Sequence, residues 1–307
     1  MEVVLIATPT VNSGNIKSLR ESIARRGWTL KEIEAKDLVL EVSPKGLRVL
    51  YEGETFTPEA VIYRMVGRFL PLLAPILDHW ISQGVCIINS PASSMAAWSK
   101  LQSTIAFSKA GVDFLQTDFT YPHHLELDLD EAPYVIKPIF GTKGHDIRFL
   151  DSNTETIRFL SSTYFYSDGL VVPPLMVQED LGIDIREIRA QVVGGKCVAL
   201  MRRTPPIGER FSDNLEAGVN ENLPLTHPAV VIAEKVAKAL DLDFAGIDLF
   251  EKTDGTCLAS EANGSPGWIG LELVSGVSVS DALFDLIEAK VKCKRETRAE
   301  FKASCPL

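Results

Sequence analysis

The first 90 residues alternate between short apolar runs and amphipathic stretches. Runs of strand length occur at "VVLIAT", "LKEIEA", "AVIYRM" and "VCIINS", and helical patterns separate them at "NIKSLRESIARRG" and "FLPLLAPILDHWISQG". Strands that alternate with helices are typical of a parallel sheet with helical crossovers. We therefore predict an α/β domain over residues 1–90.

The pattern changes twice after residue 90. Helical segments, one of them stopped by Gly111, lead to the strand "YVIKPIF", a glycine-containing loop and the extended run "HDIRFL", which indicates an α+β unit over residues 91–172. The later runs "LMVQEDL", "DIREIRAQVVG" and "KCVALMRRT" predict strands, followed by a helix and a hairpin, in a third unit over residues 173–293. We expect the charged segment 294–307 to be a frayed tail.

Composition limits the class of protein. The 307 residues carry a net charge of −10 without a concentrated basic run, which argues against a nucleic-acid surface. No apolar run approaches the ~20 residues that cross a bilayer and no signal peptide is visible, so we expect a cytoplasmic protein. The five cysteines are scattered, and we expect free thiols, with Cys86, Cys197 and Cys257 in strand cores.

The hairpin "FAGIDLFEKTDGTCLASEANG" places two carboxylates in positions where apolar side chains are expected. A two-residue turn at Asp254-Gly255 sets Asp248 directly opposite Glu261, with Cβ atoms ~5 Å apart, and Asn263 follows on the same face. The opposite face, toward a core, would then hold Ile247, Leu249, Leu258 and Ala262. Two carboxylates and an amide oxygen suit Mg²⁺ or Mn²⁺. The alternative is an ordinary acidic, solvent-facing sheet surface.

Lys137 interrupts the apolar strand "YVIKPIF" directly before a loop that contains Gly141, Lys143 and Gly144. Such a loop can fold backbone N–H groups over phosphates while a lysine neutralises their charge. The alternative is a solvated strand edge, because the spacing is not that of the GxxxxGK[ST] phosphate loop.

Arginines crowd into neighbouring predicted strands at Arg186, Arg189, Arg202 and Arg203. Arginine forks bind carboxylates and phosphates, and they stabilise charge that develops during phosphoryl transfer. The alternative is salt bridging to nearby acids such as Glu179, Asp180 and Glu187. We expect the arginines to be functional as a group.

The ordered motifs resemble those of the ATP-grasp superfamily and, within it, the RimK-like carboxylate–amine ligases. The resemblance covers nearly the whole chain through "NSPASSMAAWSK", "YVIKPIFGTKG", "VQEDL", "EIRAQVVGGKCVALMRR", "DNLEAG", "FAGIDLF" and "SEANGSPG". It implies an ATP-grasp fold, of mixed α/β and α+β class, behind an N-terminal Rossmann-like (pre-ATP-grasp) domain. ATP would lie between the two ATP-grasp units, with the glycine-containing loop as a mobile lid.

The resemblance also implies roles for individual residues. The groups near the phosphates of ATP would be Lys100, Lys137, Gly141, Thr142, Lys143 and Gly144. The rest of the nucleotide site would be the adenine hinge Gln178, Glu179, Asp180 and Leu181, the ribose ligand Glu187, and Asn214. The catalytic residues would be Lys137, Arg189 and Arg203, and two magnesium ions would be held by Asp248, Glu261 and Asn263. Substrate contacts are expected at Arg64, Arg202 and Ser265, with Arg68 beside the first of them.

The implied reaction is ATP-dependent amide formation. ATP phosphorylates a substrate carboxylate, and an amine then displaces phosphate from the acyl-phosphate. We expect glutamate or another amino acid as the amine, and a small acidic coenzyme or metabolite, such as a tetrahydromethanopterin-type cofactor, as the acceptor. The alternatives are a protein C-terminus as the acceptor, a phosphotransferase, and a nucleotide-binding regulatory module without catalysis. We also expect a homo-oligomer, with "FLPLLAPILDHW" as a candidate interface.

Overall fold

The computed structural model describes residues 1–7, 13–64, 70–120, 133–140, 147–150, 175–182, 185–204 and 219–304. Its first part contains β1 (Glu2–Ala7), α1 (Ser13–Arg25), β2 (Thr29–Ile33), the 3₁₀ helix η1 (Ala35–Asp37), β3 (Leu38–Ser43), β4 (Gly46–Tyr51), β5 (Glu54–Thr55), β6 (Ala60–Arg64), α2 (Leu70–Ser82) and β7 (Cys86–Ile88). The middle part contains α3 (Pro91–Trp98), α4 (Lys100–Ala110), β8 (Thr117–Thr120), β9 (Tyr134–Pro138), β10 (Arg148–Leu150) and β11 (Leu175–Glu179). The last part contains β12 (Arg186–Val193), β13 (Lys196–Thr204), β14 (Val219–Leu223), α6 (Ala229–Ala239), β15 (Phe244–Glu251), β16 (Cys257–Asn263), α7 (Ile269–Ser275) and α8 (Val279–Ser304).

The N-terminal domain is built on the predicted parallel sheet, in the order β2-β1-β6-β7. One face of β1, with Val3 and Leu5, packs against α1 and α8, and the other face, with Val4 and Ile6, packs against α2. β1 is apolar throughout because both of its faces are buried. The same packing uses most of the apolar surface of α2, the candidate oligomer interface, within the domain itself.

A second, antiparallel sheet of this domain, β3-β4-β5, was not predicted. Only Leu38 and Val49 of β3 and β4 are buried against the domain core, and β5 has only two residues. Their apolar pattern is correspondingly weak, which explains why sequence patterns missed the sheet.

The middle part forms the antiparallel sheet β10-β9-β11-β8. β11 lies between β9 and β8, so it belongs to this sheet and not to the third unit, which we had started at residue 173. Conversely, Ala106 and Phe107 of α4 are buried in the core of the last part of the chain. The sheets and cores therefore divide the chain differently from the predicted boundaries.

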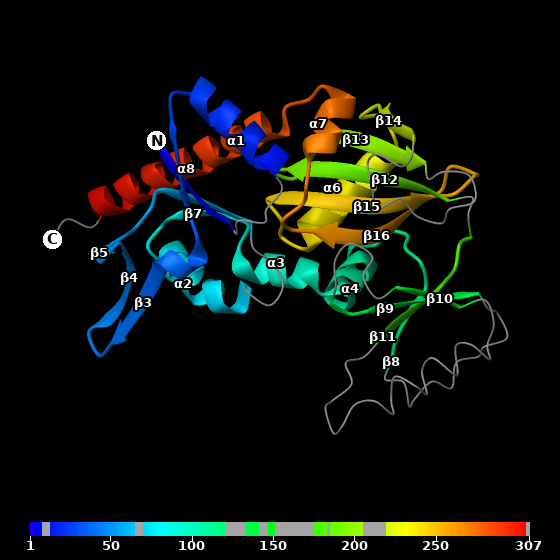
Figure 1. The fold of residues 1–307 in the computed structure, drawn as a ribbon, viewed down its shortest axis with the longest axis horizontal. Coiled ribbons are helices and arrows are strands. Elements are labelled where there is room, and N and C mark those ends of the chain that lie inside the picture. The colour runs from blue at the N-terminus through cyan, green and yellow to red at the C-terminus, as the bar shows by residue number, and fades with distance from the viewer. Residues whose placement is uncertain are drawn as a thin grey trace.

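The last part forms the antiparallel sheet β14-β13-β12-β15-β16, with α6 packed on one face (Figure 1). The opposite face is covered only in part, by α7, α8 and the N-terminal domain, through Phe244, Met201 and Trp268. The uncovered part of this second face carries the predicted carboxylates, and we call it the site face.

Helix α8 continues to Ser304, well past residue 293, where we had expected a frayed tail to begin. Residues 277–305 contain neither proline nor glycine, so the sequence gives no signal that would stop the helix. Lys294 anchors this extension by donating to the carbonyl of Val85 at 2.7 Å.

Two general expectations can be compared with the fold. Cys86, Cys197 and Cys257 are free and buried, as predicted. In the described part of the chain no helix is both long and apolar enough to cross a membrane.

Candidate active site

The β15–β16 hairpin sets Asp248 directly opposite Glu261, as predicted. The turn is wider than predicted, because the N–H of Lys252 donates to the carbonyl of Thr256 across a three-residue loop. Gly255 ends this loop with a left-handed backbone, at a φ of 84°.

A β-bulge compensates for the wider turn. Leu249 pairs with Ala259, so an unbroken ladder would set Asp248 opposite Ser260, but the register shifts by one residue at this point. The shift also corrects one prediction. Leu258, expected in the core with Ile247, instead lies on the site face because it precedes the bulge.

Two arginines of neighbouring strands face Asp248. Arg189 lies opposite Asp248 in the β12–β15 ladder, with its Nε 2.6 Å from Asp248 Oδ1. Arg203 Nη2 lies 3.6 Å from the same oxygen, and its Nη1 lies 3.8 Å from Glu187 Oε2. The Arg189 contact is an ion pair outside hydrogen-bond geometry. Among the described residues, Arg189 Nε and Nη1 are therefore buried without hydrogen-bond partners, and Arg203 Nε is buried without one as well. Buried donors with this spare capacity suit an anion.

Lys137 of β9 approaches from the middle sheet and is only 8% exposed. Its Nζ donates to Gln178 Oε1 at 3.0 Å and lies 5.9 Å from the ring centroid of Phe250. Burial lowers the pKa of Lys137 to about 8, although the negative charge of Glu261 opposes this shift. The solvated strand edge considered for Lys137 is therefore wrong.

Glu261 lies in the field of several charged groups. Burial raises the pKa of its carboxyl group, Lys100 opposes this shift, and Asp248 adds to it. Lys100 is the first residue of α4, and its backbone N–H donates to the carbonyl of Ile139 at the end of β9. The sheet face, β9 and the start of α4 thus bring two carboxylates and several cations together.

The predicted adenine hinge consists of the last two residues of β11 and the two residues after it. Gln178 is buried and donates to Thr117 Oγ1 at 2.8 Å, whereas Glu179 is exposed. The Asp180 N–H donates to the carbonyl of Pro133, and Asp180 Oδ1 accepts from the Gly182 N–H at 2.9 Å. These bonds fix the hinge backbone between the middle sheet and β12.

An apolar cluster lies beside the charged groups. It consists of the buried residues Leu115, Phe250 and Leu258, with Leu181 and Ile185 packed against them. This cluster joins the hinge to the site face, and Phe250 brings it next to Lys137.

The loop after β16 is tied to the N-terminal domain. The Asn263 amide oxygen accepts from the Ser265 N–H at 2.8 Å. Arg64 donates from Nη1 to the carbonyl of Pro266 at 2.5 Å, and its guanidinium lies 4.8 Å from the ring centroid of Trp268. Burial lowers the pKa of Arg64 to about 10. Arg64 and Ser265, both predicted substrate contacts, therefore lie at the same loop.

Arg202, in contrast, lies on the α6 face of β13. Its Nε and Nη2 bind the Glu251 carboxylate at 2.7 and 2.9 Å, and Nη1 lies 2.8 Å from Glu221 Oε2. The structure does not bring Arg202 to Asp248, because adjacent residues of a strand point to opposite faces. For Arg202, the alternative of salt bridging to nearby acids is therefore the one that the structure shows.

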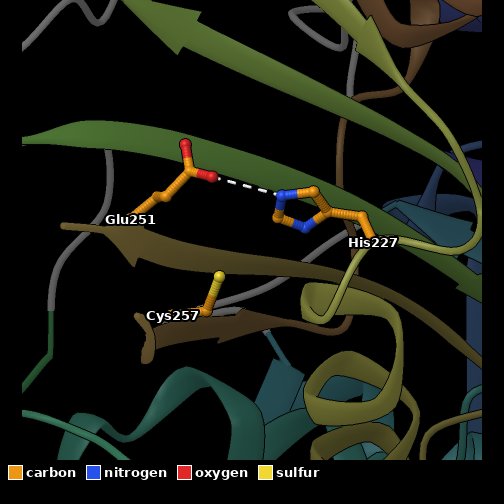
Figure 2. Close-up of side chains that lie close together, drawn as sticks. All are labelled: His227, Glu251 and Cys257. Atoms are coloured by element: carbon orange, nitrogen blue, oxygen red, sulfur yellow. Dashed lines mark hydrogen bonds and ion pairs between the residues drawn. The ribbon is translucent and has the colours of Figure 1, made fainter. Parts of the chain in front are cut away.

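Figure 2 shows the neighbours of Glu251 on this face. His227 Nε2 lies 3.1 Å from Glu251 Oε1, and one potential ligand atom from each of His227, Glu251 and Cys257 lies within 4.8 Å of the others. Such a set can in principle hold a metal ion. Both oxygens of Glu251 are already bound by Arg202, however, so we regard the group as an arginine–glutamate–histidine network.

Several predicted residues lie outside the described part of the chain. They are Arg68, the loop residues Gly141, Thr142, Lys143 and Gly144, and Asn214.

Sequence reasoning missed other residues at the site. Leu258 was hidden by the assumed register, whereas Phe250, two residues after Asp248 on the same strand, could have been placed on the site face by alternation. Asn89 binds the backbone of Phe244 twice and the carbonyl of Gly264, all at 2.8 Å, but a lone asparagine after a strand carries no signal for such contacts. Gly246 lies within the quoted motif "FAGIDLF", and its place inside a strand is a weak signal of close packing.

Comparisons with known proteins identify the family of the chain. The RimK-like ATP-grasp domain family matches residues 100–287, more than half of the chain. A "probable alpha-L-glutamate ligase" of Vibrio parahaemolyticus is 25% identical over 295 residues, covering 94% of this chain and 96% of the relative. A relative of the same name from Thioalkalivibrio sulfidiphilus is 27% identical over 293 residues, with 92% and 95% coverage.

Solved structures have the same fold. The ATP-grasp ligase PsnB, in a complex with a precursor variant, Mg and ADP, superimposes with a TM-score of 0.72 at 17% identity, over 94% of this chain and 98% of PsnB. The D-alanine–D-alanine ligase of Bacillus anthracis, in complex with ATP, gives 0.66 at 16% identity, over 97% and 99%. The predicted fold class is confirmed. The chain belongs to the RimK-like ATP-grasp family and is an ATP-dependent ligase.

Proposed function

We propose that this ligase joins glutamate to the carboxylate of a small acidic metabolite or coenzyme, through an acyl-phosphate. The observation that carries the proposal is the pair Asp248 and Glu261, opposed on one sheet face and surrounded by cationic side chains. The names of the relatives support glutamate as the amine.

Magnesium fits the donor set. Asp248 and Glu261 offer hard oxygen ligands and repel each other at cross-strand distance, so a divalent cation between them relieves the repulsion. Asn263 follows on the same face. When bound, magnesium neutralises phosphate charge and orients the phosphates. We propose that Asp248, Glu261 and Asn263 would hold two such ions.

The nucleotide would lie between the middle sheet and the site face. We assign the adenine to the apolar cluster of Phe250, Leu258 and Leu181, with the hinge backbone of residues 178–181 at its edge. We assign the ribose to Glu187, which is paired with Arg203.

The cations supply electrostatic stabilisation. A carboxylate that attacks the γ-phosphate of ATP forms a new O–P bond while ADP leaves, and negative charge accumulates around the transferred phosphoryl group. Lys137, Arg189 and Arg203 are buried or half-buried with donor capacity to spare, so they can neutralise this charge without reorganising water. The glutamate amine then displaces phosphate from the acyl-phosphate, leaving an amide.

Arg64 supports an acidic acceptor. Its guanidinium is held at the loop of Ser265 and Pro266 by the N-terminal domain, and its Nε is buried without a hydrogen-bond partner among the described residues. A carboxylate of the acceptor would supply that partner.

The test measures phosphate release from Mg-ATP in the presence of glutamate and a panel of carboxylates. Each product is identified by intact mass spectrometry. The panel contains small di- and tricarboxylates, phosphorylated acids, and peptides that end in glutamate. Acceptor-dependent release with a gain of one or more dehydrated glutamate units supports the proposal. A gain of one phosphoryl group would indicate a phosphotransferase, a product only with peptides would indicate a protein C-terminus, and ATP binding without turnover would indicate a regulatory module.

A further inference from the structure

We propose that Gly246 is a positioning residue for Arg189, an inference that rests on the proposed function of this site. The missing side chain of Gly246 leaves the space in which the Arg189 guanidinium reaches Asp248. Gly246 touches no reacting group itself and acts only through Arg189.

Gly246 lies in the middle of the sheet, two residues before Asp248. It pairs with Gln191 of β12 and with Asn263 of β16, so both edges of its backbone are in ladders. Its φ does not lie in the left-handed region that favours glycine. A glycine in a strand interior weakens the strand, and here backbone conformation gives no reason for one. The reason must be space.

The space above Gly246 is filled by two neighbours. A Cβ atom added at this position would lie 2.5 Å from Arg189 Nη1 and 2.7 Å from Pro266 Cβ. Both distances are shorter than van der Waals contact allows, so both neighbours must give way.

The two neighbours differ in how easily they move. Pro266 is a ring fused to the backbone, and Arg64 holds its carbonyl at 2.5 Å while stacking on Trp268. Arg189 Nη1 is the end of a flexible side chain and has no hydrogen-bond partner among the described residues. A methyl group at position 246 would therefore displace the Arg189 guanidinium.

Displacement of Arg189 changes the charge at the site. Its Nε lies 2.6 Å from Asp248 Oδ1, whereas the other arginine, Arg203, lies 3.6 Å from the same atom. Asp248 would lose its nearer cation, and the guanidinium would leave its position for phosphoryl transfer. A misplacement of about 1 Å can cost roughly 100-fold in rate.

The kinetic test compares Gly246→Ala, Arg189→Lys and the double variant in acceptor-dependent phosphate release. We expect Gly246→Ala to lower kcat by about 10-fold to 100-fold with little change in the KM for ATP, because the apolar cluster is untouched. In the Arg189→Lys background the same substitution should cost clearly less, since its target is gone. Gly267→Ala is the matched control, because its Cβ would meet only Asn15 Nδ2 at 3.4 Å.

A second measurement does not depend on turnover. Mn²⁺ binding to the nucleotide-free protein, followed by electron paramagnetic resonance, should tighten in Gly246→Ala and in Arg189→Ala, because Arg189 competes for Asp248. If Gly246→Ala fails to fold, the Gly246→Ala/Arg189→Ala double variant should regain part of the lost stability in urea unfolding, because only the clash with Pro266 remains.

Three outcomes overturn the proposal: wild-type kcat and Mn²⁺ affinity in Gly246→Ala, equal losses with and without Arg189, or a Gly246→Ala/Arg189→Ala variant that is no more stable than Gly246→Ala. Failure of the proposed function would look different. The wild-type protein itself would then show no acceptor-dependent release, while Mn²⁺ binding and folding would still test the role of Gly246.

Discussion

Asp248 and Glu261 face each other across two strands only because a β-bulge corrects the register that their own turn sets. Their side chains share the site face with Arg189 and Arg203, while Lys137 approaches from another sheet. Cationic side chains from two different sheets therefore gather around this pair of carboxylates.

We expect Glu261→Gln to lower acceptor-dependent phosphate release by about 100-fold or more, because an amide binds magnesium less strongly than a carboxylate. Chelation of magnesium should stop release in the wild-type protein. Asp254→Asn is the control, since Asp254 is exposed at the tip of the same hairpin. Unchanged turnover in Glu261→Gln would remove Glu261 from the metal site.

The pKa of Lys137, about 8 in the free enzyme, predicts an alkaline limb in the pH profile of kcat/KM for ATP. The ammonium group is charged below this pKa and loses its proton as the pH rises through it, so affinity for phosphate should fall above about pH 8. In Lys137→Arg the guanidinium stays charged, and the limb should move to higher pH. An identical limb in this variant would assign the titration to another group.

Glu251 is expected to stabilise the fold in a pH-dependent way. Burial alone would raise the pKa of Glu251, but hydrogen bonds from Arg202 and His227 lower it below its ordinary value. The folded pKa is lower than the unfolded one, so the stabilisation is present above the unfolded pKa and is lost as the pH falls through the folded value.

Glu251→Gln should thus lower the free energy of unfolding by about 3 kcal/mol at pH 7, because Arg202 loses its buried partner. The difference from wild type should shrink below about pH 4. Urea unfolding at a series of pH values measures this. Glu21→Gln, in an exposed pair with Lys17, should change stability by less than about 1 kcal/mol and serves as the control. A difference that does not depend on pH would contradict the assignment.

Asn89 should be important for stability although it is uncharged. It is 1% exposed, and its amide joins the end of β7 to Phe244 and to Gly264 near the site loop. Asn89→Ala leaves buried backbone groups unpaired and should lower the free energy of unfolding by about 3 kcal/mol. The exposed Asn222→Ala, measured by the same urea titration, should have an effect below about 0.5 kcal/mol. Equal effects would show that the Asn89 contacts are dispensable.

Sequence patterns predicted the larger elements well. The parallel sheet of the first domain was recognisable because strands buried on both faces are continuous apolar runs, as in β1. The β3-β4-β5 sheet was missed because most residues of β3 and β4 are not buried, and β11, which we had assigned to the third unit, pairs with β8 and β9 of the middle sheet. Pairing between distant strands leaves no local signal.

The sequence by itself determined the family, the parallel domain and the chemical types that gather at the site, because motifs and polarity periods are local properties of the chain. Only the tertiary structure decided which arginine faces the carboxylates. Arg202 and Arg203 are identical in type and adjacent in sequence, yet the pleat of β13 sends one to Glu251 and the other to Asp248. The same holds for Gly246, whose importance lies in the space that Arg189 and Pro266 occupy above it. Register, face and free space are set by contacts between distant segments, so they exist only in the folded chain.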